Sequence, residues 1–162
     1  MILAIREWDA AILREPAQPV DRINLRLIDD MVETMYAIGA AGLAANQIGV
    51  RERILLIDRT PANKPPIIAV NPKIVAWSDL TEVHGEGCFS LPGVYGMVRR
   101  PAQVTLEAQN AKGEFFSETL LSATWEGVIA QHELDHLNGI FFTDYATEIW
   151  NDPTGVTATY KK

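Results

Sequence analysis

The chain has 162 residues, of which 48% are hydrophobic and 22% charged, a composition that fits one globular domain with a sizeable core. Its formal net charge of −7, from 14 basic and 21 acidic side chains, would repel phosphate backbones, so we expect no direct binding to nucleic acid. No run approaches the roughly 18 apolar residues of a membrane span, and the N-terminus lacks the basic and apolar regions of a leader. We therefore expect a cytoplasmic protein without membrane contact.

The first strong periodicity predicts a helix over residues 24–38. One face of this helix would carry the apolar side chains Leu25, Ile28, Met31, Val32 and Met35. A methionine stripe at this spacing is typical of core packing. Gly39 would end the helix, and the small residues that follow it would let another backbone approach closely, as where the edge of a strand pairs with an extended ligand.

Strand patterns separated by turn residues come next. The candidate strands are residues 54–58, 67–70, 74–77, 104–109 and 114–121. A proline-rich loop over residues 61–66, the pair Asn71 and Pro72, and a turn at residues 111–113 separate them, which favours antiparallel hairpins. One helix precedes the strands and another follows, so we predict an α+β fold rather than alternating α/β units, with antiparallel sheets around a central helix.

That second helix, expected from about Trp125 until Asn138 and Gly139, contains the pattern His-Glu-x-x-His. Positions i and i+4 share one helix face, so His132 and His136 can present two imidazole nitrogens to one ion. An apolar stripe made by Trp125, Val128 and Ile129 leads into both histidines, which indicates that they point inward.

Glu133 lies beside the first histidine, where a carboxylate can hold a metal-bound water and accept its proton. The alternative is that His132 and His136 are hydrogen-bonded core residues with no metal. A third ligand would decide between the two interpretations.

Several side chains compete for the role of third ligand. Cys88, the single cysteine, lies in an expected glycine-flanked loop at residues 86–90 and would give a Cys, His, His set with an open fourth position, as a catalytic metal requires. Most lone cysteines, however, are inert and buried. Asp144 or Glu148, which follow the helix, would instead supply the carboxylate of an HExxH-type metalloendopeptidase. His84 is the remaining histidine, of the kind that is usually solvated in a loop.

Three segments together resemble the signature motifs of the peptide deformylase family. They are GLAANQ at residues 42–47, EGCFS at residues 86–90 and QHELDHLNG at residues 131–139, in that family's order, and the similarity covers about residues 5–145. The resemblance implies a single deformylase-like catalytic domain over residues 1–162. It also implies that Cys88, His132 and His136 hold one divalent ion, Fe(II) in the family's physiological form, which zinc, nickel or cobalt can replace.

The resemblance further implies a reaction, in which the formyl group is removed from the N-terminal formylmethionine of nascent peptides and formate is released. Glu133 would take a proton from water and return it to the leaving amine. The side-chain amide of Gln47 and the backbone N–H of Phe89 would stabilise charge on the formyl oxygen. The residues implied in substrate binding are Gly42, Glu86, Gly87, Val128 and Ile129.

The sequence departs from the family pattern in three places. Ala40 replaces the first glycine of the first motif, where Gly39 can supply the turn instead, and Phe89 replaces the usual leucine, which affects the shape of the pocket more than the chemistry. Residues 151–155 would break any helix after Trp150, so we expect no C-terminal helix for ribosome docking. Residues 156–160 suit a short edge strand or a frayed end.

Two rival functions remain besides deformylation. A metalloendopeptidase would cleave internal peptide bonds, and a non-catalytic binder would retain formylated peptides without releasing formate. The residues expected to act as base and oxyanion donors are all present in this sequence, which gives no support to the second rival.

Overall fold

A computed structural model describes residues 1–152 and residue 154. The helices are α1 (Leu25–Ala37) and α2 (Glu126–Leu137). The strands are β1 (Gly42–Ala44), β2 (Ile54–Ile57), β3 (Ile67–Trp77), β4 (Thr81–Cys88), β5 (Leu91–Pro101), β6 (Gln103–Gln109), β7 (Phe115–Leu121) and β8 (Glu148–Asn151). Among these described residues, no helix has the length and apolar character needed to cross a membrane.

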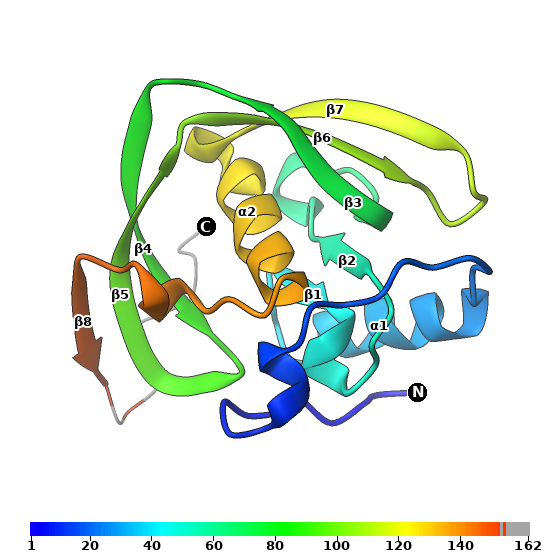
Figure 1. Cartoon of the computed structure of the whole chain (residues 1–162), viewed down its shortest axis with the longest axis horizontal. Coiled ribbons are helices and arrows are strands. Elements are labelled where there is room, and N and C mark those ends of the chain that lie inside the picture. Colours follow the sequence, from blue (N-terminus) through cyan, green and yellow to red (C-terminus); the bar gives the residue numbers. More distant parts are fainter. Residues whose placement is uncertain (153, 155–162) are drawn as a thin grey trace.

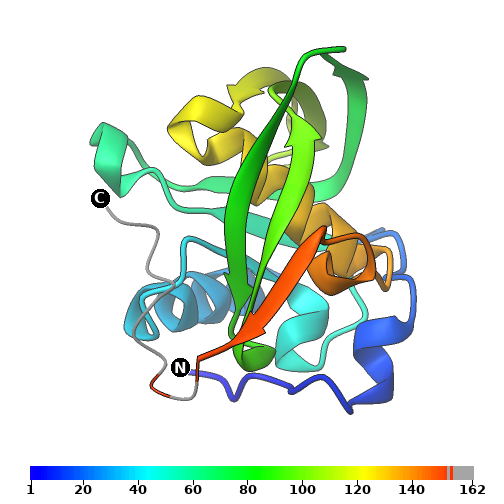
Figure 2. The same cartoon turned by 90° about the vertical axis from the view of Figure 1, so that its left-hand side faces the viewer.

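The strands form two antiparallel sheets on either side of α2 (Figure 1). The larger sheet has the order β1-β2-β3-β6-β7, and the smaller has the order β4-β5-β8. Turned by a quarter, the molecule shows the smaller sheet crossing in front of α2 (Figure 2). The expected α+β fold with antiparallel sheets around a central helix is confirmed.

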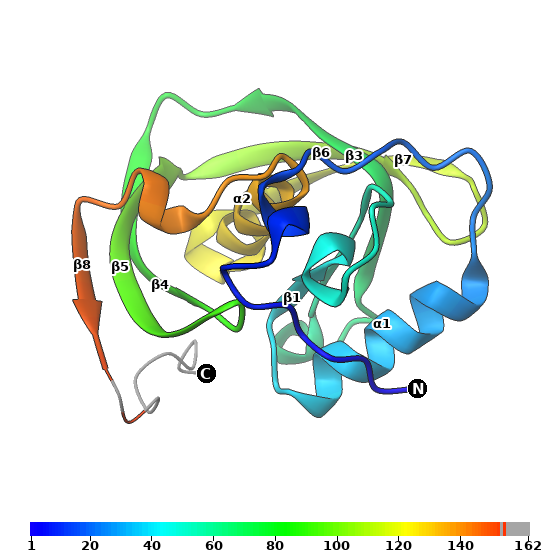
Figure 3. The same ribbon diagram turned by 60° about the horizontal axis from the view of Figure 1, so that its bottom comes forward.

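Both faces of the larger sheet are buried along β2. Alternate residues of a strand point to opposite faces, so Leu55 and Ile57 pack in the cluster that contains Ile129 of α2. Ile54 and Leu56 pack in a second cluster with the methionines of α1. The two helices therefore lie on opposite sides of β1 and β2 (Figure 3).

Helix α1 agrees with the periodicity of its sequence. Asn24 caps its N-terminus by accepting a hydrogen bond from the backbone N–H of Leu27 at 3.2 Å. Met31 and Met35 are fully buried, as the methionine stripe predicted. Gly39 follows in the left-handed conformation, with φ of 70°, so Ala40 can stand at the next position without strain.

The prediction of two strands on either side of Asn71 and Pro72 is wrong, because β3 runs through both residues. Asn71 has a φ of 53°, and the pairing with β6 shifts register between Val70 and Lys73. The side chain of Asn71 accepts from the N–H of Val20 at 2.7 Å and donates to its carbonyl at 2.9 Å. These bonds hold a β-bulge, so the proline bends the strand and does not end it.

The interpretation of residues 86–90 as a loop is wrong for residues 86–88, which end β4 and pair with β5. Phe89 and Ser90 form the turn between these two strands. Gly96 of β5 has no room for a side chain, since a Cβ there would lie 2.8 Å from the carbonyl oxygen of Glu148 in β8. A glycine in this part of the chain can thus admit a neighbouring strand and does not by itself indicate a loop. The expectation for residues 156–160 falls outside the described residues.

Candidate metal centre

Cys88, His132 and His136 come together between the end of β4 and the middle of α2. One ligand atom from each lies within 4.8 Å of the other two. The Cys88 Sγ is 3.1 Å from Nε2 of His136, and the two imidazole rings are 4.9 Å apart between centroids. Among the candidates for a third ligand, it is therefore Cys88 that lies next to His132 and His136 in the structure.

The surroundings of His136 suit a metal ligand. Its ring is buried, and Nδ1 has no hydrogen-bond partner among the described residues. Burial, with the neighbouring charges of His132 and Arg100, lowers the pKa of His136 well below its ordinary value. The ring is therefore neutral at physiological pH, the form in which an imidazole coordinates a metal.

The orientation of His132 is set from behind by Glu86. Nδ1 of His132 lies 2.7 Å from Oε1 of Glu86, an ionised carboxylate that can only accept, so this nitrogen carries the proton and Nε2 carries the lone pair that coordination would need. Carboxylates commonly orient metal-binding histidines in this way. A thiolate and two oriented imidazoles form a donor set that fits a divalent transition metal, so the residues present fit the ion that the sequence predicts.

Arg100 in turn fixes Glu86. Its Nε and Nη2 donate to the two oxygens of Glu86 at 2.6 and 2.8 Å, and its Nη1 donates to Asp135 at 2.9 Å. Burial alone would raise the pKa of Glu86, but the hydrogen bonds from Arg100 and His132 outweigh it and lower this pKa to about 2. Glu86 therefore stays ionised behind the histidine. Neither this pair nor its role was apparent from the sequence.

Glu133 is buried beside the cluster with one oxygen unused. Its Oε2 has no hydrogen-bond partner among the described residues. Burial raises the pKa of Glu133 to about 7, although the charge on His132 opposes the shift. A carboxyl with such a pKa can both accept and return a proton near neutral pH.

Gln47 and Phe89 lie on the opposite side of the thiol from the helix. The amide nitrogen of Gln47 is 3.5 Å from the Cys88 Sγ and 3.3 Å from Oγ of Ser90, while its oxygen accepts from the N–H of Ala44 at 2.9 Å. The amide is therefore buried and oriented with its N–H groups toward the metal centre. Phe89 follows the cysteine directly, and its side chain is about half exposed, at 49%.

The residues of the alternative interpretations lie elsewhere. Both oxygens of Asp144 accept from Arg14, at 2.6 and 3.0 Å, and Glu148 lies exposed in β8. A carboxylate third ligand, and with it the endopeptidase, is not favoured. His84 is not a solvated loop residue: it belongs to β4, packs edge-on against Trp125 with ring centroids 5.2 Å apart, and lies 3.1 Å from Glu82.

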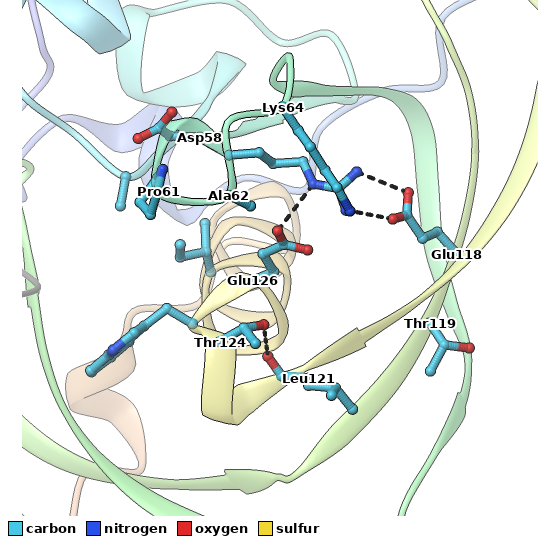
Figure 4. Close-up of a pocket in the computed structure, with 13 residues that line it drawn as sticks. Asp58, Pro61, Ala62, Lys64, Glu118, Thr119, Leu121, Thr124 and Glu126 are labelled. Atoms are coloured by element: carbon cyan, nitrogen blue, oxygen red, sulfur yellow. Dashed lines mark hydrogen bonds and ion pairs between the residues drawn. The ribbon is translucent and has the colours of Figure 1, made fainter. Parts of the chain in front are cut away.

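The residues expected to bind substrate differ in their positions. Gly42 packs against α2 so tightly that a Cβ there would lie 2.6 Å from Ile129 and 2.7 Å from Glu133. Ile129 also lines a pocket of about 590 Å³ beside the N-terminal end of α2 (Figure 4). Val128 and Glu86 are fully buried and do not line that pocket, and Gly87 lies in β4 next to the cysteine.

Comparison with known proteins gives one consistent result. The family model described as polypeptide deformylase matches residues 2–151. A peptide deformylase of Rhizobium meliloti is 43% identical over 87% of this chain and 83% of its own length. One from Azotobacter vinelandii is 39% identical over 93% of this chain and 90% of its own length.

Solved structures agree with the sequence relatives. The crystal structure of a peptide deformylase from Thermotoga maritima superimposes with a TM-score of 0.83 at 33% identity, covering 91% of this chain and 99% of that one. A peptide deformylase from Legionella pneumophila also gives 0.83, at 36% identity, covering 96% of this chain and 89% of that one. With a metal-binding cluster formed by the same motifs that first suggested the resemblance, the chain belongs to the polypeptide deformylase family.

Proposed function

We propose that this protein is a metal-dependent peptide deformylase, which removes the formyl group from the N-terminal formylmethionine of nascent peptides and releases formate. Family membership supports the activity. The observation that carries the proposal is the gathering of Cys88, His132 and His136 around one point, with the buried carboxyl group of Glu133 next to them in α2. We further propose that residues 1–162 act as a single catalytic domain.

Cys88, His132 and His136 would hold the ion. We propose Fe(II), with zinc, nickel or cobalt as possible replacements, because a thiolate with two imidazoles accepts all four. When bound, such an ion acidifies a water molecule and polarises a carbonyl oxygen. Arg100 and Glu86 keep His132 in the tautomer that coordination needs.

Glu133 acts as the proton carrier in this proposal. Its Oε2 accepts a proton from the attacking water, whose oxygen bonds to the formyl carbon. The carbon–nitrogen bond then breaks, and the protonated carboxyl group returns its proton to the departing amine. The raised pKa of Glu133 supports both halves of this exchange near neutral pH.

Gln47 and Phe89 would stabilise the charge that develops on the formyl oxygen. The N–H groups of the Gln47 amide already face the cysteine, because its oxygen is held by the N–H of Ala44. The backbone N–H of Phe89 would supply the second donor. A donor of this kind contributes about 3 kcal/mol to the transition state in comparable enzymes.

The peptide backbone would bind along the open edge of β1. The N–H of Asp58 donates to the carbonyl of Ala41, so in the alternating pattern of an antiparallel pair Ala41 and Leu43 face β2. Gly42 therefore presents its own N–H and carbonyl outward, toward an added strand. β4 is likewise the edge of its sheet, so Gly87 would face the peptide from the other side.

The methionine side chain would pack against Ile129, beside Gly42. Val128 and Glu86 are enclosed by the protein, so in this proposal they support the wall of the pocket from beneath. Recognition through the backbone beyond the first residue would allow many different nascent chains as substrates.

We propose that these substrates are met in the cytoplasm. β8 occupies residues 148–151, where a C-terminal helix would otherwise begin, so the proposal includes no ribosome docking by such a helix. The net charge of −7 argues against direct binding to nucleic acid.

The test is formate release from formyl-Met-Ala-Ser by protein purified without oxygen, with the metal content measured on the same sample. We expect stoichiometric formate and free Met-Ala-Ser, with one ion per chain. An N-acetylated peptide with the same sequence in its interior should stay intact. Cleavage inside that peptide, or binding of formyl-Met-Ala-Ser without formate release, would overturn the proposal.

A further inference from the structure

A pocket of about 590 Å³ lies between the N-terminal turn of α2, the end of β7 and the connection that follows β2 (Figure 4). We call it the end pocket. Its volume is in the range of pockets for whole small molecules, which is more than one methionine side chain fills. The three family motifs contribute little to it, so its purpose does not follow from them.

One wall of the end pocket is apolar and leads toward the reacting groups. It includes Ala41, Trp125 and Ile129. Ile129 lies one turn before Glu133 on α2, a rise of about 6 Å. Gly42 touches both of these side chains, and Ala41 precedes it directly. A substrate paired with the edge of β1 would therefore have its first side chain at the entrance of this pocket.

An ion-paired arginine forms another wall of the end pocket. Arg59 donates through Nη2 and Nη1 to the two oxygens of Glu118 in β7, at 2.6 and 3.3 Å, and through Nε to Glu126 of α2 at 3.0 Å. Dashed lines that end on Glu118 and Glu126 mark these bonds in Figure 4. The side chain of Arg59 is only 12% exposed, so the guanidinium is part of the wall.

The aromatic wall is preformed too. Trp125 has a φ of 67°, a conformation that bulky residues rarely adopt, and such strain is kept only where the surroundings enforce it. Its ring packs against His84 of β4 with an angle of 64° between the planes. The wall is thus held from the same strand that carries Cys88.

We propose that Arg59 is a specificity-determining residue: the end pocket accepts first-residue side chains longer than methionine, and the ion-paired guanidinium sets the upper limit of their length. This inference rests on the proposed function, since the side chain must belong to an N-formylated substrate. Arg59 contacts no reacting atom and acts only through the shape of the pocket.

The test compares three N-formyl peptides that share the sequence Ala-Ser after the first residue. That residue is methionine, 2-aminooctanoic acid with a six-carbon side chain, or 2-aminodecanoic acid with an eight-carbon side chain. For the parent protein we expect kcat/KM for the octanoic peptide within about tenfold of the methionine peptide, and at least a tenfold fall for the decanoic peptide.

Arg59→Ala should raise kcat/KM for the decanoic peptide at least tenfold and leave the methionine value within about threefold. Arg59→Lys keeps a cation of similar length and should keep the parent order. Glu118→Gln removes one charge of the ion pair and lets the Arg59 guanidinium move, so it should shift selectivity in the same direction by a smaller factor. Arg51→Ala is the matched control, because it breaks an exposed ion pair with Glu15 elsewhere on the surface.

The inference is overturned if the parent loses more than a hundredfold on the octanoic peptide, or if Arg59→Ala changes all three substrates in proportion. Should Arg59→Ala not fold, the decision passes to Glu118→Gln, for which an unchanged ratio of kcat/KM between the decanoic and methionine peptides would be equally decisive. Hydrolysis of the methionine peptide by the parent separates these outcomes from failure of the proposed function itself.

Discussion

At the scale of single residues, the site depends on which polar atoms are hydrogen-bonded and which have no hydrogen-bond partner among the described residues. Nδ1 of His132 is bound to Glu86, and Oε2 of Glu133 has no partner among the described residues. In the proposed function, the first arrangement orients a metal ligand, and the second leaves a carboxylate oxygen that can receive a proton. Two substitutions separate these roles.

Glu133→Ala should retain the metal and lose at least about a thousandfold in kcat, within the range by which a positioned proton carrier accelerates a reaction. The carboxyl group is buried beside the metal ligands but is not one of the clustered donors, so coordination should persist. Metal analysis and formate release on one preparation check both statements. Turnover equal to that of the parent would remove Glu133 from the mechanism.

Cys88→Ala should lose the metal, since it removes one of three clustered donors and leaves two imidazoles. Measured metal per chain should fall from about one toward zero, with formate release lost in parallel. His84→Ala is the control, because that histidine packs on Trp125 and is outside the cluster. Retention of a full metal complement by the cysteine variant would contradict the ligand assignment.

At the scale of elements, the close approach of β1 to α2 places the edge of a strand beside the carboxyl group of Glu133. Gly42→Ala would put a Cβ within 2.6 Å of Ile129 and 2.7 Å of Glu133. We expect a loss of about 1–3 kcal/mol in the free energy of unfolding from this overpacking, with a fall in kcat. Urea denaturation and formate release measure the two effects.

Gly85→Ala provides the comparison for that substitution. The nearest atom to its Cβ would be the sulfur of Met97 at 3.7 Å, an ordinary contact. Its effect on unfolding should be small. If both glycine variants unfold at the same urea concentration, close packing at β1 is not what requires Gly42.

The elements that could be predicted are those with an undisturbed period. α1 has a continuous apolar face, and β6 and β7 alternate on either side of a turn. β4 and β5 were not predicted because glycines interrupt the alternation of apolar and polar residues in their sequences. These glycines are explained by residues far along the chain, such as Glu148, whose backbone lies against Gly96. Periodicity within one segment cannot reveal a strand that arrives from another part of the chain.

The same limit applied to the site. His132, Glu133 and His136 were predictable because one helical turn relates them. Cys88 joined them only through resemblance to the family, since no local spacing connects the end of β4 to α2. The bond between Arg100 and Glu86 was beyond prediction, because the sheet register pairs Arg100 with Glu82 while its guanidinium reaches Glu86.

At the scale of the whole molecule, Arg100 joins the smaller sheet to the central helix. It binds Glu86 of β4 and Asp135 of α2, and its Nη1 also donates to the hydroxyl of Tyr145 at 3.1 Å. Arg100→Ala should lower the free energy of unfolding by about 3–5 kcal/mol, because Glu86 would remain as a buried charge without its cationic partner and with only the hydrogen bond from His132. Urea denaturation measures this loss.

Arg99→Ala is the matched control for that substitution, since the neighbouring side chain is exposed and binds only the hydroxyl of Thr81, at 3.2 Å. Its effect should stay within about 0.5 kcal/mol. Similar losses for the two arginine variants would show that the buried ion pair does not join the sheet to the helix.

Helix α2 both packs in the core and carries the two clustered histidines, which has a consequence for thermal unfolding. Ile129, Ala130 and Leu137 anchor the helix in the cluster that holds the larger sheet together, and the histidines lie on the same twelve-residue segment. Helix α2 therefore cannot unfold locally while the larger sheet stays folded. Thermal inactivation and the loss of helical circular dichroism should therefore have the same midpoint temperature, with no folded but inactive intermediate.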